Sequence, residues 1–196
     1  MPKTSTYSAL PPDAAGHVPY SVEEDAVWRD LMARQMPSVQ ARMAAPYLKG
    51  LRRLSLPTDR VAQCKEVSAC LTAATGWRVE PVPALIGFGR FFGLLADRCF
   101  PAASFIRRRE DFDYIEEPDI FHEIFGHTPL LTDPRFAAFS QAIGEAGLKA
   151  GKADYVWLIR LFWFTIEFGL AREDGVLKGL GSGLASSIAE LDWATS

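Results

Sequence analysis

The chain has 196 residues, a formal net charge of −3 and a hydrophobic content of 48%. This length fits one domain with a sizeable core, and the slightly acidic balance argues against broad nucleic-acid binding. The three cysteines match neither a disulfide framework nor a common zinc motif, and no apolar run reaches the roughly 18 residues that span a bilayer. Because the N-terminus also lacks the apolar segment of a secretion signal, we expect a cytoplasmic protein without membrane or nucleic-acid partners.

The first part of the chain predicts an extended arm followed by helices. Residues 1–20 are rich in Pro, Ser and Gly, which predicts a weakly ordered arm. Three helices are then expected, over residues 21–36, 38–51 and 57–74. Ser21 and Glu24 form a capping box at the first start, Pro37 is expected to interrupt the helical run, and Gly76 to close the third helix.

The second part predicts short strands among further helices. A strand is expected at 77–82 and a strand or an extended passage at 100–106. Helices are expected at 91–98, from 118, from 133 and over 153–170, with a loop at 84–90 and a glycine-rich turn at 176–187. Asp133 suits a helix N-cap and Pro134 the first helical position. The fold class predicted is mainly α with a few short β-strands, forming a single catalytic domain over residues 21–196.

The most informative stretch is 118–130, read as P-D-I-F-H-E-I-F-G-H-T-P-L, which holds two of the three histidines. His122 and His127 are five residues apart, a step of about 140° around an ideal helix. Their side chains therefore diverge unless the helix ends or distorts between them. Gly126 and Pro129 are the residues expected to cause that break, since Pro129 disfavours helical geometry in the residue before it.

Glu167 lies forty residues beyond His127 in the apolar run W-L-I-R-L-F-W-F-T-I-E-F-G-L. A buried carboxylate requires a cation, a metal or strong hydrogen-bond donors, and Arg160 is about 10.5 Å away along a helix axis. Two histidines and one carboxylate are the ligands of a non-haem Fe(II) site, which leaves one face of the metal open. The structural alternatives are two histidines without a metal and a glutamate paired with an arginine from elsewhere.

These motifs resemble those of a known family. The stretch at 118–131, the W-F-T-I-E-F-G-L segment and the G-x-G-L-x-S-S turn are similar, in this order, to the pterin-dependent aromatic amino acid hydroxylases, especially the bacterial phenylalanine 4-hydroxylase branch. The resemblance runs from about residue 21 to the end. It implies that His122, His127 and Glu167 bind Fe(II), that a tetrahydropterin is the co-substrate and O2 the oxidant, and that phenylalanine is hydroxylated to tyrosine.

The resemblance also implies roles for single residues. Substrate-binding roles fall on Arg107, Pro118, Trp163 and Ser186, and pterin-binding roles on Leu85, Ile86, Phe91 and Glu123. Arg107 and Ser186 match residues near the amino acid carboxylate, a task that suits a guanidinium. Glu123 matches a catalytic acid that helps oxygen activation. Without the resemblance, Arg107 reads as a surface residue of an R-R-R run and Phe91 as ordinary core.

Several alternatives stay open at this stage. The preferred ring could be that of tryptophan or tyrosine, or the chain could be an inactive truncated homologue that acts as a binding module. A zinc hydrolase using His122, His127 and Glu123 is disfavoured, because zinc proteases space their histidines four apart. Family catalytic domains continue beyond the serine turn, so we expect the C-terminal part of the domain to be missing here. Without the family's regulatory and tetramerising segments, we expect a monomer.

Overall fold

Helices dominate the computed structural model, which describes residues 7–83, 86–151 and 153–196. The α-helices are α1 (Val22–Arg42), α2 (Ala45–Leu54), α3 (Cys64–Thr75), α4 (Phe88–Ala96), α5 (Thr128–Leu131), α6 (Pro134–Lys149), α7 (Tyr155–Phe162), α8 (Ser182–Ser186) and α9 (Ile188–Ala194). Two π-helical turns are η2 (His122–His127) and η3 (Trp163–Glu167), and η1 (Arg109–Asp111) is a 3-10 turn. The strands are β1 (Arg78–Val82), β2 (Cys99–Ala103), β3 (Leu170–Glu173) and β4 (Val176–Gly179). The predicted fold class, mainly α with a few short strands, is confirmed.

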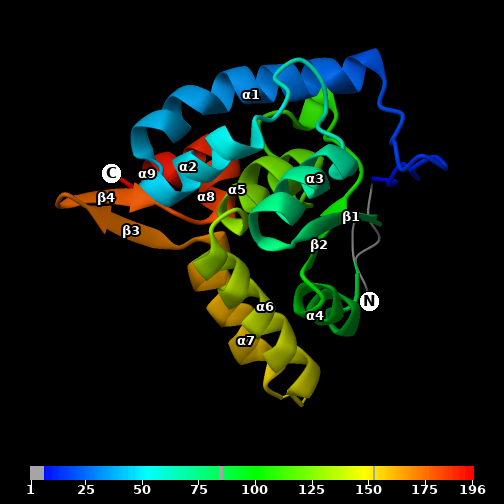
Figure 1. The fold of residues 1–196 in the computed structure, drawn as a ribbon. Helices are drawn as coiled ribbons and strands as arrows, with labels where there is room; N and C mark the ends of the chain where they lie inside the picture. The colour runs from blue at the N-terminus through cyan, green and yellow to red at the C-terminus, as the bar shows by residue number, and fades with distance from the viewer. Residues whose placement is uncertain (1–6, 84–85, 152) are drawn as a thin grey trace.

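Figure 1 shows α1 running along one side of the molecule, while α6 and α7 extend together from the opposite side. Between them lies a core whose largest side chains are aromatic. Trp28 of α1 meets Phe121 edge-on at 5.3 Å between ring centroids, and Phe121 stacks on Phe125 at 4.8 Å. Tyr47 of α2 packs against Phe125 from another side at 6.3 Å. Since Phe121 and Phe125 flank His122 in the sequence, the centre of the core positions the histidine-bearing turn.

The helix α1 begins as predicted but does not stop at Pro37. In its capping box Ser21 Oγ accepts from the N–H of Glu24 at 3.2 Å, and the Glu24 carboxylate accepts from the N–H of Ser21 at 2.7 Å. The expected interruption at Pro37 was wrong, because the helix continues to Arg42. A helix-interior proline costs about 3 kcal/mol. Burial of Gln35 before it and Val39 after it, both at most 1% exposed, ties the helix to the core on either side of the proline.

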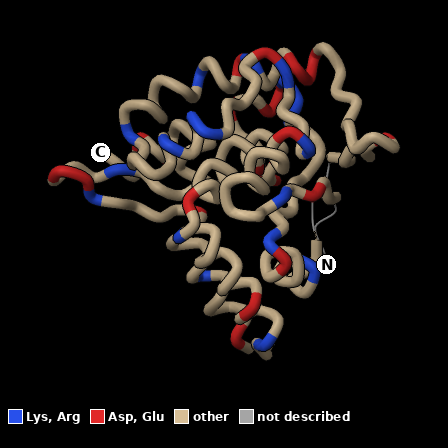
Figure 2. Tube along the Cα trace, in the orientation of Figure 1, with Lys and Arg blue, Asp and Glu red and all other residues tan. Residues whose placement is uncertain are grey.

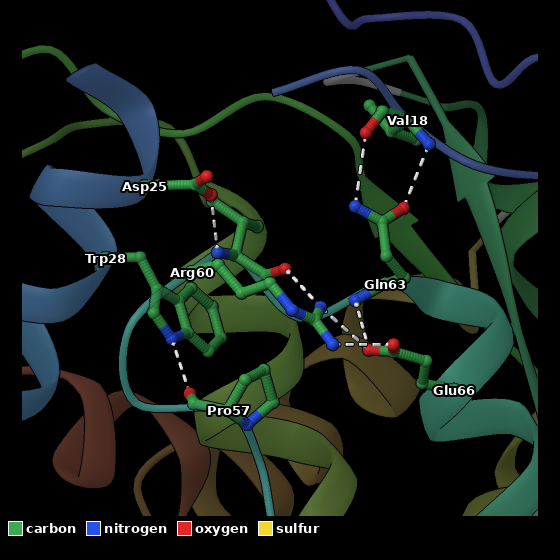
Figure 3. Close-up of polar contacts among 8 residues, drawn as sticks. Val18, Asp25, Trp28, Pro57, Arg60, Gln63 and Glu66 are labelled. Atoms are coloured by element: carbon green, nitrogen blue, oxygen red, sulfur yellow. Dashed lines mark hydrogen bonds and ion pairs between the residues drawn. The ribbon is translucent and has the colours of Figure 1, made fainter. Parts of the chain in front are cut away.

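The loop before α3 explains why this helix starts at Cys64 and not at Pro57. Trp28 Nε1 donates to the Pro57 carbonyl at 2.8 Å, and the Asp25 carboxylate accepts from the N–H of Val61 at 2.9 Å (Figure 3). These two bonds hold the segment against α1 and take up polar groups that a helix would use otherwise. The predicted end of α3 is confirmed, since Gly76 has φ +78° at its C-cap.

Two small sheets complete the fold. Strands β1 and β2 pair in parallel, with Arg78 opposite Cys99 and Val82 opposite Ala103, and α4 lies in the connection between them. Strands β3 and β4 form an antiparallel hairpin, of which β4 lies within the segment expected to be only a glycine-rich turn. That expectation was wrong for 176–179. The turn residues Asp174 and Gly175 have φ of 49° and 81°, the backbone that a tight hairpin of this kind requires.

Residues 7–20, expected as part of the arm, form no helix or strand but make specific contacts. Val18 is 1% exposed, and its N–H and carbonyl bond the side-chain amide of Gln63 at 2.9 and 3.1 Å (Figure 3). Ser104 Oγ donates to the Leu10 carbonyl at 2.8 Å, and Tyr7 stacks on Phe105.

Charged residues of both signs are interspersed along the chain (Figure 2). Among the described residues, no helix has the length and apolar character needed to cross a bilayer.

Candidate active site

The two histidines of the 118–130 stretch lie on a π-helical turn, η2. In a π-helix each N–H bonds to the carbonyl five residues earlier, so residues five apart stand one above the other on the same face. This is why His122 and His127 converge, with their Nε2 atoms 3.1 Å apart and their rings nearly perpendicular at 83°. The predicted distortion between them is therefore present, and it is a widened turn within a continuing helix.

Side-chain donors take up the carbonyls of this widened turn. Tyr47 Oη donates to the Phe125 carbonyl at 2.5 Å, and Thr128 Oγ1 donates to the Ile124 carbonyl at 2.6 Å. The roles expected of Gly126 and Pro129 differ from those observed. Thr128 keeps helical dihedrals of −69° and −27°, so the proline does not break the helix before it. Gly126 allows a close approach instead, since a Cβ there would lie 2.9 Å from the Ser182 carbonyl oxygen.

Glu167 comes from the second π-helical turn, η3, where the N–H of Phe168 bonds to the Trp163 carbonyl at 2.8 Å. Its Oε1 lies 3.4 Å from His122 Nε2, and its Oε2 lies 3.2 Å from His127 Nε2. The two Nε2 atoms are 3.1 Å apart, so two imidazoles and one carboxylate from segments 40 residues apart meet around one point. Within the described chain the partners of Glu167 include no arginine.

The short helix α8 bonds a ligand at each end. Ser186 Oγ donates to the Ser182 carbonyl at 3.0 Å, and lies 2.8 Å from Nδ1 of His122. Because the single hydroxyl proton goes to the carbonyl, the oxygen accepts from His122 Nδ1–H, which leaves the lone pair of Nε2 free for a metal. At the other end, Ser182 Oγ donates to Glu167 Oε2 at 2.9 Å.

The sequence reasoning missed Ser182. Its signal was the G-S-G triplet, in which both glycines allow close approach to Glu167. A Cβ on Gly181 would lie 2.2 Å from the Glu167 carbonyl oxygen, and one on Gly183 would lie 2.8 Å from Oε1 of the same residue. The buried amide of Gln35 donates to the Ala185 carbonyl at 2.8 Å and fixes α8 against α1.

The pKa shifts of two candidate ligands, Glu167 and His122, suit a divalent cation. Burial alone would raise the pKa of Glu167, but the two imidazoles outweigh it and lower this pKa to about 2. Burial lowers the pKa of His122, which keeps its imidazole neutral at physiological pH. A neutral imidazole and an ionised carboxylate are the forms that coordinate metals.

Glu123 lies in the same region as the candidate ligands, but its pKa is shifted in the opposite direction to that of Glu167. It is 9% exposed, and one of its carboxylate oxygens lies within 4.8 Å of a ring nitrogen of both His122 and His127. Burial first, and the nearby charge of Glu167 second, raise the pKa of Glu123 well above its ordinary value. The pKa values of two neighbouring carboxyls are thus shifted in opposite directions, which is the arrangement that separates a ligand from a proton-carrying acid.

Arg107 is buried at 5% exposure and belongs to no solvated run. Its Nε and Nη2 donate to the two carboxylate oxygens of Asp119 at 2.8 and 3.1 Å. Asp119 is fully buried and also accepts from the N–H of His122 at 3.1 Å. Although burial raises the pKa of Asp119, the guanidinium outweighs this and holds it below its ordinary value. Asp119 thereby joins Arg107 to the start of the histidine-bearing turn, a link that the sequence did not reveal.

The remaining predicted residues lie at varying distances from this cluster. Phe91 meets Phe162 edge-on at 5.5 Å, and Phe162 lies 6.0 Å from the ring of His127. Trp163 is 50% exposed and packs on Phe168, while Pro118 directly precedes Asp119. Ile86 is half-buried ahead of α4. Leu85 lies outside the described residues.

Comparison with known proteins places this geometry in a family. The family model described as biopterin-dependent aromatic amino acid hydroxylase matches residues 10–196. The chain belongs to this family. Phenylalanine-4-hydroxylase of Vibrio cholerae is 50% identical over 189 residues, which cover 96% of this chain and 65% of the Vibrio protein. This chain of the biopterin-dependent hydroxylase family thus spans about two thirds of that relative's length.

Solved structures of other family members superpose closely on this fold. The apo structure of the cold-active phenylalanine hydroxylase from Colwellia psychrerythraea has a TM-score of 0.95 and 49% identity, covering 97% of this chain and 73% of that one. Phenylalanine hydroxylase of Chromobacterium violaceum, solved with bound iron(III) and oxidised 7,8-dihydrobiopterin, has a TM-score of 0.85 and 39% identity, covering 92% of this chain and 69% of that one.

Proposed function

We propose that this chain carries the catalytic site of an iron- and tetrahydropterin-dependent monooxygenase that hydroxylates L-phenylalanine to tyrosine. The observation that carries the proposal is the convergence of His122 Nε2 and His127 Nε2, 3.1 Å apart, on the carboxylate of Glu167, whose Oε1 lies 3.4 Å from the first nitrogen and whose Oε2 lies 3.2 Å from the second. Neighbouring ligand atoms around a metal, with bonds of about 2.1 Å, lie about 3 Å apart. Three such atoms on one side of a metal form the two-histidine, one-carboxylate site of non-haem iron oxygenases.

Bound iron and tetrahydropterin supply the two-electron reduction of O2 that makes one oxygen atom reactive toward an aromatic ring. The residues of the chain hold and orient the reactants. Arg107, fixed by Asp119, offers its remaining donors to the carboxylate of the amino acid. Glu123, whose pKa is raised by burial, is a proton donor beside the ligands. Phe91 provides an aromatic face for the pterin ring.

Other residues complete the proposed site. Pro118 and Trp163 line the substrate pocket, and Ile86, with Leu85, contacts the pterin. Ser186 lies near the substrate carboxylate, and its bond to His122 gives it an additional role in orienting that ligand. Phenylalanine is favoured over tryptophan and tyrosine because relatives 40 to 50% identical carry the name phenylalanine-4-hydroxylase.

We also propose that the protein is cytoplasmic and monomeric. A reducing compartment suits the free thiols of Cys64, Cys70 and Cys99. Light scattering at several protein concentrations tests the monomeric state.

The function is tested by anaerobic reconstitution with Fe(II), followed by tetrahydropterin and phenylalanine under air, with chromatographic detection of tyrosine. Tyrosine formation that requires both iron and pterin supports the proposal. Stoichiometric iron binding without tyrosine formation favours the alternative of an inactive homologue that acts as a binding module.

The alternative function, a zinc hydrolase, is supported by the proximity of Glu123 to both histidines. Metal content separates it from the oxygenase site. Glu167→Gln is expected to release the metal and Glu123→Gln to retain it, whereas the reverse result supports a site built from Glu123.

A further inference from the structure

The stretch that carries Arg107, residues 104–111, is called the Arg107 segment below. It is held from the core by the beginning of the histidine-bearing stretch. The N–H of Arg107 donates to the Asp119 carboxylate at 3.1 Å, and the N–H of Ile120 donates to the Phe105 carbonyl at 2.8 Å. It is also held from the surface by the N-terminal arm, residues 7–20, which lies about 100 residues earlier in the sequence.

Tyr7 attaches the arm to the Arg107 segment through both its ring and its hydroxyl. The ring stacks on Phe105 with centroids 4.6 Å apart, and the guanidinium of Arg108 lies 5.1 Å from the centroid of the same ring. The hydroxyl accepts from the N–H of Arg108 at 3.3 Å and donates to the carboxylate of Asp111. One side chain thereby contacts residues before and after Arg107, and it steadies the backbone from which that guanidinium projects.

The rest of the arm is attached at further positions. Ser104 Oγ donates to the Leu10 carbonyl at 2.8 Å, and Tyr20 Oη donates to the Ser104 carbonyl at 3.2 Å. Both peptide groups of buried Val18 bond the side-chain amide of Gln63, at the start of α3 (Figure 3). The arm is therefore fixed to the body of the protein near its end and reaches the Arg107 segment from that anchor.

A cavity of about 660 Å³ lies between the arm, the first turns of α1 and the Arg107 segment. Its walls include Tyr7 and Leu10 of the arm, Val27 of α1 and Arg107 itself. In a close-packed interior a segment is held by many contacts, and one substitution at its edge changes little. Because the arm spans an open space here, its hold on the segment depends strongly on the attachment at Tyr7.

We propose that the arm is a strap, closed by Tyr7 on the residues that flank Arg107, which holds this arginine where it receives the carboxylate of the amino acid. The inference rests on the proposed function, which gives Arg107 that task. Tyr7 is a positioning residue, because it acts through the Arg107 segment. Opening the strap should weaken binding of the amino acid and leave metal binding intact, since the core and α8 fix the metal ligands.

The first test is limited trypsin digestion of the metal-free protein, with the fragments identified by mass spectrometry. Trypsin cleaves after arginine, and the side chains of Arg108 and Arg109 are 61% and 55% exposed. Cleavage within a folded segment requires local opening, so its rate reports how firmly the segment is held. We expect Tyr7→Ala to accelerate cleavage at 107–109 about tenfold, the factor that corresponds to about 1.4 kcal/mol.

Two further variants calibrate the digestion. Tyr7→Phe keeps the stacked ring and removes the hydroxyl, so its cleavage rate should lie between those of wild type and Tyr7→Ala. Tyr114→Ala is the matched control, because it removes a tyrosine ring that is 75% exposed and lies three residues beyond the Arg107 segment. Its cleavage rate should equal that of wild type.

The second test measures binding of the amino acid. In the Fe(II) form with tetrahydropterin, Tyr7→Ala should raise the KM for phenylalanine about tenfold with kcat unchanged, the pattern for loss of an interaction that binds substrate and transition state equally. Calorimetric titration of the Co(II)-loaded protein with phenylalanine should show the same loss of affinity, and a Co(II) titration should match wild type. A mere loss of stability would not separate KM from kcat in this way.

The possible failures are distinguishable. Equal cleavage rates in wild type and Tyr7→Ala, or faster cleavage with unchanged phenylalanine affinity, overturn the strap and leave the proposed function standing. A loss of Co(II) binding in Tyr7→Ala overturns it as well, because the effect would then extend beyond Arg107. If wild type neither binds phenylalanine nor forms tyrosine, the proposed function fails, and the role of the strap in substrate binding fails with it. Should Tyr7→Ala not fold, Tyr7→Phe decides, since an unchanged KM and cleavage rate in that variant reject the role of the hydroxyl in closing the strap.

Discussion

The two π-helical turns that supply the candidate ligands differ in how the protein holds them. In η2 every residue from Glu123 to His127 is buried, and aromatic side chains of α1 and α2 pack around it. In η3 only Ile166 is buried, while Trp163 and Phe164 are 50% and 70% exposed. The histidine half of the site is therefore fixed by the hydrophobic core, and the carboxylate half by hydrogen bonds and close backbone contacts from α8.

The largest effect is expected from removing a ligand on the buried turn. His122→Ala leaves two protein ligands, and we expect the affinity for Fe(II) to fall by more than about 100-fold. Mutating a residue that only hydrogen-bonds a ligand lowers metal affinity by up to about 100-fold, and losing the ligand itself should lower it further. Equilibrium dialysis with Fe(II) measures it. His17→Ala is the control, because the chain's third histidine is exposed. Iron retained at one equivalent in His122→Ala would contradict the ligand assignment.

A smaller effect is expected from loosening the same turn without touching a ligand. Tyr47→Phe removes the hydroxyl that bonds the Phe125 carbonyl on the buried turn. We expect the free energy of unfolding to fall by about 1–3 kcal/mol, with weaker metal binding as the π turn relaxes. Urea denaturation and a Co(II) titration measure the two effects.

The matched control for Tyr47→Phe is Tyr114→Phe, whose side chain is 75% exposed. If both variants unfold at the same urea concentration as the wild type, the Tyr47 hydroxyl does not stabilise the turn.

The carboxylate half can be probed by pH in the metal-free protein. Glu167 has a pKa of about 2 in the folded protein, against 4.5 for an unperturbed glutamate. A lowered carboxyl pKa contributes stability that is present above pH 4.5 and is lost as the pH falls toward about 2. Over this window the free energy of unfolding should therefore fall more steeply in wild type than in Glu167→Gln.

The control for this pH comparison is Glu145→Gln, which replaces an exposed glutamate of α6. Parallel curves for wild type and Glu167→Gln would show that the histidines do not hold Glu167 in its ionised form.

The same contrast separates what the sequence could predict from what it could not. Histidine and glutamate in apolar surroundings indicated a metal from residue chemistry alone, and a spacing of five required a distorted helix. The form of the distortion depends on Tyr47, 78 residues before the carbonyl it bonds, and the pairing of Glu167 with Ser182 spans 15 residues and a hairpin. Such partners follow from tertiary packing. Packing also explains why α1 continues past Pro37, although a proline disfavours the interior of a helix.

The smallest effect is expected on the exposed face of η3. Phe164 is 70% exposed, next to Thr165 and two residues before buried Ile166. If α8 alone fixes Glu167, Phe164→Ser should change the free energy of unfolding by less than about 0.5 kcal/mol and leave Co(II) affinity unaltered. Ile166→Ser, on the buried face of the same turn, is the contrasting variant and should destabilise the protein by several kcal/mol, about the loss seen when large buried side chains are truncated. Loss of Co(II) binding in Phe164→Ser would mean that the exposed face also holds the carboxylate, and that the two halves of the site are fixed in the same way.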